Sequence, residues 1–400
     1  MIQLSNYEAI IDRCSQCNYC QATCPVYLED MVESVLARNR IHVIQETMIN
    51  KSLPLTPRAQ EIIDRCLLCT NCVQTCSSQI PIDEIIIAAR SELNQSKGGL
   101  GNIKNLVMGK LLTERGFTGM MGKAGALAQK LGIGSKEMPT LASKTFDKFY
   151  SGTIAPIGEK RGRVAYFVGC GTNFMYPDTG VASVKVLTHN GIEVVIPAGQ
   201  VCCGIPSIAE GDLKSAEDML RTNIKIFADM DVDAIITDCT SCGMMFKEKY
   251  PKILPDNDPA NILATQLAAK IWEVTDYLNH INLSQEPGAI NITYTYHVPC
   301  HRGWSPTVRN APRTVLAQIP QMELKEMDFP EHCCGAAGTF FMEHRDLSSN
   351  IRSHKVADIN DTGADLVVTQ CPICRFYLSA GLKNQEVLHP IALLAQSYGF

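Results

Sequence analysis

The spacing of the cysteines limits what this chain can fold into more than any other feature of its sequence. The 400 residues include 18 cysteines. Residues 1–10 lack the basic start and apolar core of a signal peptide, so we expect a cytoplasmic chain. Because the cytoplasm keeps thiols reduced, these cysteines do not indicate a disulfide framework. Their repeated spacings favour metal binding instead.

Two cysteine runs near the N-terminus share the spacing C-x2-C-x2-C-x3-C. Three thiolates on one tight loop can hold three irons of a cubane, and in two-cluster ferredoxins the fourth cysteine of a run ligates the other cluster. The pattern therefore predicts two [4Fe-4S] clusters with crossed ligands. One cluster would be held by Cys14, Cys17, Cys20 and Cys76, and the other by Cys66, Cys69, Cys72 and Cys24.

Zinc is the alternative for these runs, because C-x2-C pairs also bind zinc. A zinc site takes two separated pairs, whereas each run packs four cysteines into eleven residues. Ser77 stands where the first run has Pro25, which changes a turn position and not a ligand. The helical stretch between the runs, residues 32–56, resembles the two-cluster domain of succinate dehydrogenase-like iron–sulfur subunits more than a minimal ferredoxin.

The middle of the chain, residues 96–160, is rich in Gly, Ala, Met and Lys and contains no cysteine. Two stretches, Asn102–Leu112 and Met120–Leu131, can form amphipathic helices with lysines on one side. Such helices could bind a membrane or a partner subunit. They could also pack on the protein's own core, and we favour this second interpretation of a helical connector.

Self-comparison of the remaining chain reveals a repeat. Each copy has one cysteine after an apolar run, then Cys-Cys-Gly, then Cys-x-x-Cys. From Cys170 to Cys202 is 32 positions, and from Cys300 to Cys333 is 33. Chance does not produce two such matched sets of five. The first copy comprises Cys170, Cys202, Cys203, Cys239 and Cys242, and the second comprises Cys300, Cys333, Cys334, Cys371 and Cys374.

The repeat predicts where its cysteines lie in the fold. Apolar runs at Val164–Val168 and Ala234–Thr237 indicate buried parallel strands, with helices expected at Val181–Asn190 and Asp212–Asp229. Each cysteine group follows a strand or opens the next turn. Ligands of doubly wound sheets bind at the carboxyl ends of strands, so the five thiols of one copy can converge there. The glycine after each Cys-Cys pair lets the backbone approach closely.

This motif resembles the cysteine-rich CCG domains of heterodisulfide reductase-like proteins. The resemblance implies an iron–sulfur cluster in each domain, in some cases a non-cubane [4Fe-4S] cluster, while other copies hold a simpler cluster or zinc. Four ligands with one spare thiol remain an alternative. We expect an α+β chain whose mainly helical two-cluster domain precedes two α/β CCG domains. The expected boundaries are 1–95, 96–160 for the connector, 161–285 and 286–400.

The order of the modules resembles the iron–sulfur subunits of three enzymes: anaerobic glycerol-3-phosphate dehydrogenase, glycolate oxidase and heterodisulfide reductase. Local sequence favours the first of these enzymes, notably Tyr296-His297-x-Pro299-Cys300-His301. Its iron–sulfur subunit can lack a complete first CCG motif, whereas this chain keeps Cys239 and Cys242. The substrate of the complex therefore stays open between these types.

The chain shows no G-x-G-x-x-G motif and no P-loop, hence no evident flavin, nicotinamide or nucleotide site. A net charge of -5 without a basic run gives no reason to expect nucleic acid. No stretch approaches the ~20 apolar residues that cross a bilayer. The resemblance implies an electron-transfer subunit between a flavoprotein dehydrogenase and menaquinone, located peripherally on the cytoplasmic face of the inner membrane.

Two rival functions remain. In the first, a CCG cluster itself reduces a disulfide, with His301 and His332 as candidate proton donors beside Cys300 and Cys333. The plainer role for both histidines is to orient or tune the cluster. In the second rival, the CCG repeats hold zinc as a scaffold, and only the N-terminal clusters are redox-active.

Overall fold

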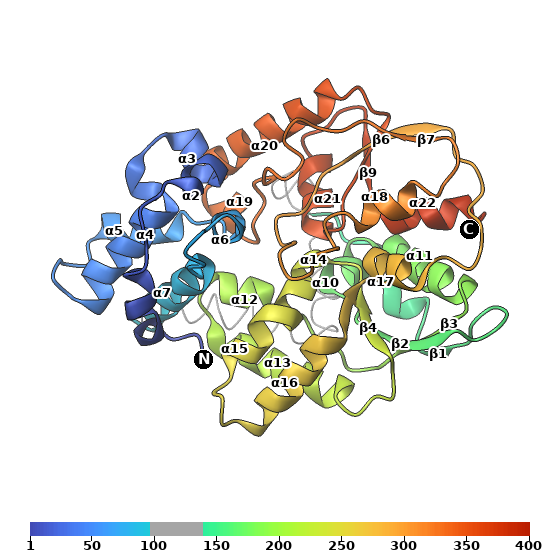
Figure 1. Cartoon of the computed structure of the whole chain (residues 1–400), viewed down its shortest axis with the longest axis horizontal. Helices are drawn as coiled ribbons and strands as arrows, with labels where there is room; N and C mark the ends of the chain where they lie inside the picture. The colour runs from blue at the N-terminus through green and yellow to red at the C-terminus, as the bar shows by residue number, and fades with distance from the viewer. Residues whose placement is uncertain (97–138) are drawn as a thin grey trace.

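The computed structural model describes residues 1–96 and 139–400. The helices expected at Asn102–Leu112 and Met120–Leu131 lie outside these described residues. Residues 1–96 form a helical unit at one end of the molecule (Figure 1). Its elements are η1 (Leu4–Tyr7), α1 (Glu8–Ile11), α2 (Tyr19–Thr23), α3 (Pro25–Asp30), η2 (Glu33–Val35), α4 (Ala37–Ile44), η3 (Gln45–Ile49), α5 (Pro57–Asp64), α6 (Asn71–Gln74) and α7 (Ile82–Ser96).

The first sheet has the strand order β1-β3-β2-β4-β5. Its strands are parallel except for β1, which pairs antiparallel with β3. The strands are β1 (Gly152–Ile154), β2 (Gly162–Tyr166), β3 (Ile192–Ile196), β4 (Ala234–Thr237) and β5 (Ile271–Glu273). The helices with it are η4 (Phe146–Lys148), α10 (Cys170–Phe174), α11 (Pro177–His189), α12 (Ile205–Ala209), α13 (Leu213–Phe227), α14 (Thr240–Met244), η5 (Met245–Lys249), α15 (Tyr250–Ile253), α16 (Pro259–Lys270) and α17 (Val274–Ile281).

The second sheet repeats this topology with the order β7-β6-β8-β9, all parallel. Its strands are β6 (Ile292–Tyr296), β7 (Met322–Leu324), β8 (Leu366–Val368) and β9 (Glu386–Leu388). Its helices are α18 (Ala311–Leu316), α19 (Phe340–Glu343), α20 (Arg345–Asp361), α21 (Pro372–Ser379) and α22 (Pro390–Ser397).

These elements follow from local sequence. The residues of β4 and β8 are all buried, as their unbroken apolar runs predict for parallel strands covered on both faces. Helix α13 starts where Asp212 accepts a hydrogen bond from the backbone N–H of Ser215, an N-cap that satisfies an otherwise unpaired donor. The helical N-terminal unit and the two α/β units confirm the predicted α+β class.

The first sheet begins earlier in the chain than residue 161. Strand β1 lies within the stretch expected to be connector, and Phe146 ahead of it is fully buried. The Phe146 ring packs edge-on against Tyr166 of β2, with 5.7 Å between the ring centroids. Burial of this aromatic residue extends the α/β unit toward the N-terminus.

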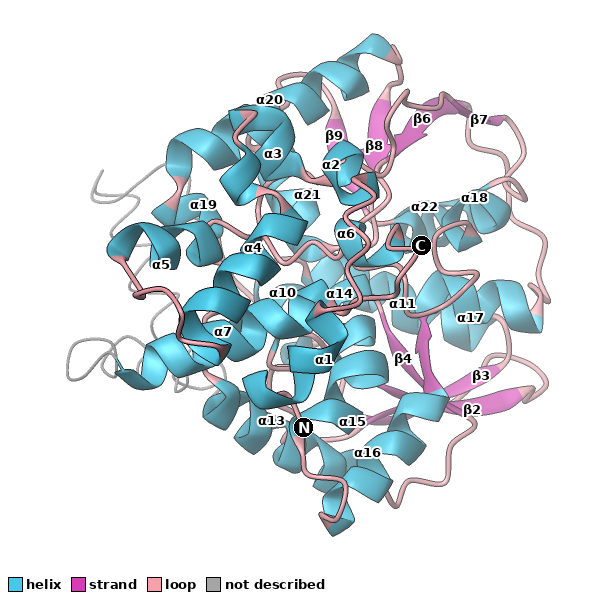
Figure 2. Cartoon of the chain, turned by 60° about the vertical axis from the view of Figure 1, so that its left-hand side comes forward, coloured by secondary structure: helices cyan, strands magenta, loops and turns pink. Residues whose placement is uncertain are grey.

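Helices α11, α17, α18 and α22 lie between the two sheets, which Figure 2 shows as separate groups of strands. One continuous hydrophobic core runs through this layer and contains Val164 of the first sheet together with Leu366 of the second. Polar contacts cross it too, since Gln370 Nε2 donates to Glu273 Oε2 over 2.7 Å. The two repeats therefore form one packed body.

The N-terminal helices dock on this body through buried charge. Lys249, which is 3% exposed, lies 2.6 Å from Asp83 Oδ2 and 2.9 Å from Glu84 Oε1 at the start of α7. Arg90 of the same helix donates to the backbone carbonyls of Ala209 and Cys66, each over 2.7 Å. These contacts fix the first α/β unit against a cysteine loop of the helical unit.

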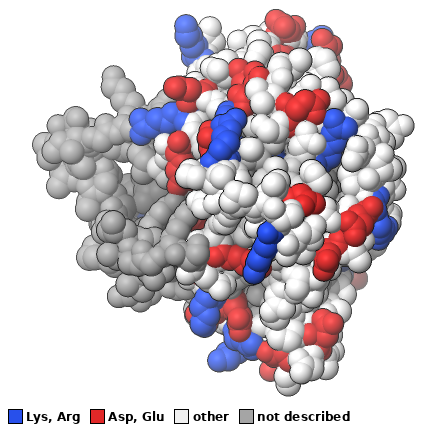
Figure 3. Space-filling view, turned by 90° about the vertical axis from the view of Figure 1, so that its left-hand side faces the viewer, with Lys and Arg blue, Asp and Glu red and all other residues white. Residues whose placement is uncertain are grey.

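The described surface is mixed in charge. On the end of the molecule where the N-terminal helices lie, acidic and basic side chains are interspersed with broad uncharged areas (Figure 3). Within residues 1–96 and 139–400, no helix is both long enough and apolar enough to cross a membrane.

Candidate metal centres

The eight N-terminal cysteines surround two separate cavities. The loop before α2 and the start of α2 supply three thiols of the first cavity, and the turn after α6 supplies the fourth. The second cavity takes its fourth thiol from the turn between α2 and α3. The first is lined by Cys14, Cys17, Cys20 and Cys76. The second is lined by Cys24, Cys66, Cys69 and Cys72. The structure thus brings together each crossed set predicted from sequence; cluster ligation stays a prediction.

The two cysteine loops share an unusual backbone. Gln16 and Asn18 in the first loop, and Leu68 and Thr70 at the same positions in the second, all have positive φ between 52° and 66°. Residues other than glycine rarely adopt this conformation, and it clusters at binding sites where the surroundings enforce it. In the second loop it turns the N–H of Leu68 toward Cys66 Sγ, 3.4 Å away.

Burial and Arg40 both act on the thiols of the second cavity. Burial raises the pKa of the Cys72 thiol well above its ordinary value. Burial also raises the pKa of Cys24, and Arg40 partly offsets this because its Nη1 lies 3.8 Å from Cys24 Sγ. Thiols that are costly to ionise here would gain compensation from bound iron, whose positive charge favours thiolates. Four converging thiols and a buried cation fit an iron–sulfur cluster.

The α/β unit built on the first sheet, called the first CCG unit from here on, gathers its five cysteines at the carboxyl ends of its strands. Cys170 opens α10 after β2, and Cys239 is the N-cap of α14 after β4. The Sγ atoms of Cys170 and Cys202 lie 3.8 Å apart. Hydrogen bonds with Cys202 and Cys242 lower the pKa of the Cys203 thiol. The predicted convergence at this edge of the sheet is what the structure shows.

The second CCG unit repeats the arrangement. Cys334 Sγ and Cys374 Sγ lie 3.5 Å apart, and Cys371 is the N-cap of α21 after β8. Cys300 and Cys333 form a hydrogen bond that raises the pKa of Cys300. Gly335 has a φ of +90°, and a Cβ there would lie 2.8 Å from the Ser348 carbonyl oxygen. Glycine is therefore required for the turn that presents both adjacent cysteines.

The cysteine groups of different units touch one another. A hydrogen bond with the Cys333 thiol raises the pKa of Cys69, which places the second N-terminal cavity beside the second CCG unit. Cys239 in turn donates a hydrogen bond that lowers the pKa of Cys371, so the two CCG units also meet at their thiols. Cys17, at the far end, is exposed. Burial raises the pKa of Cys20 in the first cavity, and electrostatic repulsion from Cys24 of the second cavity adds to this effect. The four groups therefore neighbour one another in order, beginning at the exposed Cys17.

His301 lies where three of these groups meet. Its Nε2–H donates to the carbonyl of Leu68 over 3.0 Å, and its Nδ1 accepts from the Ser241 hydroxyl over 2.9 Å. Leu68 belongs to the second cysteine loop and Ser241 to the Cys-x-x-Cys of the first CCG unit. Burial lowers the pKa of His301, so the ring is neutral. Both nitrogens hold structural bonds, which favours an orienting role over proton donation.

His332, the other predicted histidine, stacks on Phe329 with ring centroids 4.6 Å apart. Burial lowers the pKa of its ring. It lines a surface cavity that reaches Cys333.

Sequence reasoning overlooked two arginines at the cysteine groups. Arg40 donates to the backbone carbonyls of Ile62 and Arg65 as well as approaching Cys24. Arg302, which is 7% exposed, pairs with Glu331 over 2.9 Å and follows directly after the Cys300-His301 pair. A cation two positions from a predicted ligand is a signal that could have identified Arg302. Arg40 carries no such local signal.

The fold and the site define a class: iron–sulfur proteins with a two-cluster helical unit followed by paired cysteine-rich domains. The chain matches the cysteine-rich CCG domain twice, at residues 164–247 and 294–379, and the 4Fe-4S dicluster domain at residues 10–80. It is 32% identical to the lactate utilization protein A of Bacillus pumilus over 58% of this chain and 96% of that protein. This chain belongs to the family of CCG-domain iron–sulfur proteins.

Further similarities extend over more of the chain. It is 29% identical to a subunit of the anaerobic glycerol-3-phosphate dehydrogenase of Escherichia coli K12, over 80% of this chain and 83% of that one. A crystal structure of a hypothetical protein from Helicobacter pylori shares the fold, with a TM-score of 0.54 and 11% identity over 98% of this chain and 71% of that chain.

Relatives from methanogens are longer than this chain. The chain spans 58% of an uncharacterized iron–sulfur protein of Methanococcus maripaludis, at 28% identity over 81% of its own residues. It spans 52% of a subunit of the CoM/CoB fumarate reductase of Methanothermobacter marburgensis, at 29% identity over 66% of its own residues. These relatives therefore carry segments beyond the aligned region.

Proposed function

We propose that this chain is the electron-transfer subunit of a flavin-dependent dehydrogenase complex of the glycerol-3-phosphate or 2-hydroxy-acid type. The observation that carries the proposal is the continuous series of cysteine groups, from exposed Cys17 to the CCG units. The named relatives, a subunit of a dehydrogenase and a lactate utilization protein, support the substrate class. Electrons from a partner's flavin would pass along this series toward menaquinone.

The series favours an order of transfer. The group with Cys17 is the exposed end, and the group with Cys69 adjoins the second CCG unit at Cys333. Iron–sulfur clusters bound at these groups supply reversible one-electron transfer. The chain's own contribution is position: the loops hold the thiols, His301 links three groups, and Arg40 places positive charge at one of them.

The crossed ligand sets give a test of the proposed electron transfer along the cysteine groups. Cys20→Ser should remove one cubane and Cys24→Ser the other, although both residues lie in the same sequence run. Each variant should stop quinone reduction while substrate still reduces the flavin of the copurified complex. Electron paramagnetic resonance of the anaerobic protein reports which cluster is lost. Unchanged quinone reduction in either variant contradicts the proposal.

Reduction of a disulfide at the second CCG unit is the second candidate. The cavity at His332 favours it, because a surface cavity lined by a histidine reaches Cys333. The relative named as a subunit of the CoM/CoB fumarate reductase supports a reductase role for this candidate. Oxidation of the reduced protein by a disulfide, without quinone, supports this candidate. Zinc in place of iron in the CCG units excludes both functions for those units.

A further inference from the structure

One of the differences between the two CCG units lies three residues before the first cysteine of each. His297 follows β6, and its equivalent after β2 is Phe167. Phe167 is fully buried in an aromatic group, with its ring centroid 4.7 Å from that of Phe246. A hydrocarbon ring completes the core at that place in the first unit. In the second unit, the same place holds a side chain with two nitrogen atoms.

His297 is fully buried, yet neither Nδ1 nor Nε2 has a hydrogen-bond partner. Its backbone N–H donates to the carbonyl of Val368 over 3.0 Å, which fixes the residue against β8. A buried polar atom without a partner costs about 1–3 kcal/mol. The side chain therefore lacks a partner that the site must supply.

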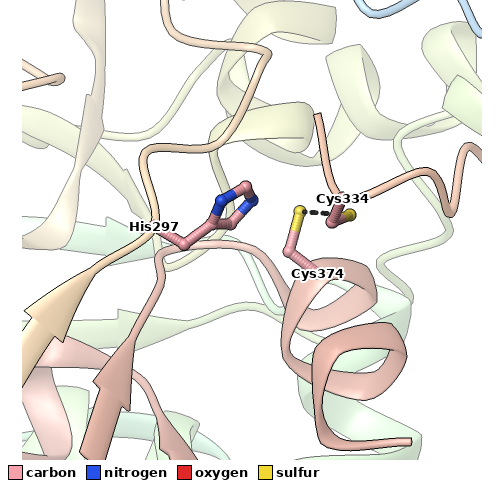
Figure 4. A group of neighbouring side chains, drawn as sticks. All are labelled: His297, Cys334 and Cys374. Carbon is pink, nitrogen blue, oxygen red and sulfur yellow. Dashed lines mark hydrogen bonds between the residues drawn. The ribbon is translucent and has the colours of Figure 1, made fainter. Parts of the chain in front are cut away.

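The ring faces two thiols. A ring nitrogen of His297 and the sulfurs of Cys334 and Cys374 all lie within 4.8 Å of one another, and all three residues are buried. The three side chains converge from the end of β6, the Cys-Cys-Gly turn and the first turn of α21 (Figure 4). The two sulfurs, 3.5 Å apart, are close to the ~3.8 Å expected for thiolates that share one tetrahedral metal ion with bonds near 2.3 Å.

We propose that His297 is a nitrogen ligand of the metal centre in the second CCG unit, bound together with Cys334 and Cys374. Imidazole and thiolate together suit iron and zinc, which accept mixed N and S ligands. The first unit, with Phe167 at this position, offers thiolates alone. The paired domains then hold chemically different centres. This inference rests on the proposed metal centre of the second unit.

His297→Phe is the central variant, since it installs the residue that the first unit already uses. His332→Phe is the matched control, because it also removes a histidine beside a predicted ligand but preserves stacking on Phe329. His297→Cys keeps a donor atom and guards against simple misfolding. Each full-length protein is purified anaerobically, analysed for iron, zinc and sulfide, and studied by pulsed electron paramagnetic resonance in oxidised and reduced states. X-ray absorption at the zinc edge covers a zinc-loaded centre.

A nitrogen ligand gives a strong coupling to ¹⁴N, or histidine scattering at the zinc edge, in the wild-type protein and in His332→Phe. We expect this signal to disappear in His297→Phe and His297→Cys, while His297→Cys keeps the full metal content. If the wild-type centre lacks this nitrogen signal, or if His297→Phe keeps it, the assignment of His297 as a ligand is wrong, while the metal centre itself is unaffected. Metal and sulfide contents unchanged by Cys334→Ser with Cys374→Ser instead overturn the metal centre itself, and the inference with it.

Discussion

Removal of the Lys249 ammonium tests how the helical unit is held against the first CCG unit. The ammonium is buried between Asp83 and Glu84, and breaking a buried ion pair by removing one partner costs roughly 3–5 kcal/mol. Glu84 keeps Lys252 at 2.7 Å, so the uncompensated charge falls mainly on Asp83. We therefore expect Lys249→Met to lower the free energy of unfolding by about 3 kcal/mol, the lower end of that range.

Lys252→Met is the matched control. Its side chain is 50% exposed, and exposed ion pairs contribute about 0–1 kcal/mol. Anaerobic urea unfolding of both variants, followed by tryptophan fluorescence, compares the two losses at low and high salt. The buried pair should keep its effect at high salt, since screening acts mainly on exposed charges. Adding Asp83→Asn to Lys249→Met should restore much of the stability.

Equal losses in the two single variants would refute this reasoning, and so would a Lys249→Met loss that salt abolishes. The outcome bears on function as well. Asp83 also lines the cavity of Cys24, Cys66, Cys69 and Cys72. An unpaired carboxylate there would add negative charge beside a cluster, so the variant should also shift the reduction potential of that cluster downward.

Three further predictions follow from buried groups. Burial raises the pKa of Glu273 to about 8, so between pH 4.5 and 8 the folded state holds a proton that the unfolded state has lost. The free energy of unfolding should therefore fall by about 1.4 kcal/mol per pH unit over this range. Glu273→Gln should flatten that slope in urea titrations at several pH values. Gly335→Ala should cost at least about 2 kcal/mol in the same assay, against about 1 for Gly338→Ala, whose Cβ meets nothing within 4 Å; equal costs would contradict the steric argument. Arg40→Met should lower the reduction potential of the cluster at Cys24, measured by a redox titration with resonance detection, and an unchanged potential would show that this cation does not act on the cluster.

Much of the site could be predicted because the spacing of neighbouring cysteines along the sequence indicates which of them come together. The spacing C-x2-C-x2-C keeps three thiols within one short loop, and the fourth cysteine of each run lies in the cavity of the other run. The apolar runs of β4 and β8 likewise predict buried strands without reference to the rest of the fold. The repeat then transfers each conclusion from one CCG unit to the other.

The contacts between units could not be predicted in this way. His301 bonds to Leu68, 233 positions away, and Lys249 bonds to Glu84, 165 positions away. Such pairs depend on how the helical unit and the two α/β units pack together, which periodicity and propensity do not encode. His297 could not be identified from its position in the sequence either. It lies three residues before Cys300, but only its burial and its unpaired nitrogens distinguish it from an ordinary core residue.

The crossed pairing of Cys24 and Cys76 with the opposite runs has a thermodynamic consequence. A cluster bound by either crossed set would tie the first run to the second, as a covalent cross-link does, and would close a loop of about fifty residues. By the chain-entropy relation for cross-links, closing such a loop lowers the conformational entropy of the unfolded chain and so stabilises the folded chain by about 4 kcal/mol. Both clusters close nearly the same loop, so the first to be inserted brings the thiols of the second together. Oxidative loss of one cluster would leave the other as the remaining tie.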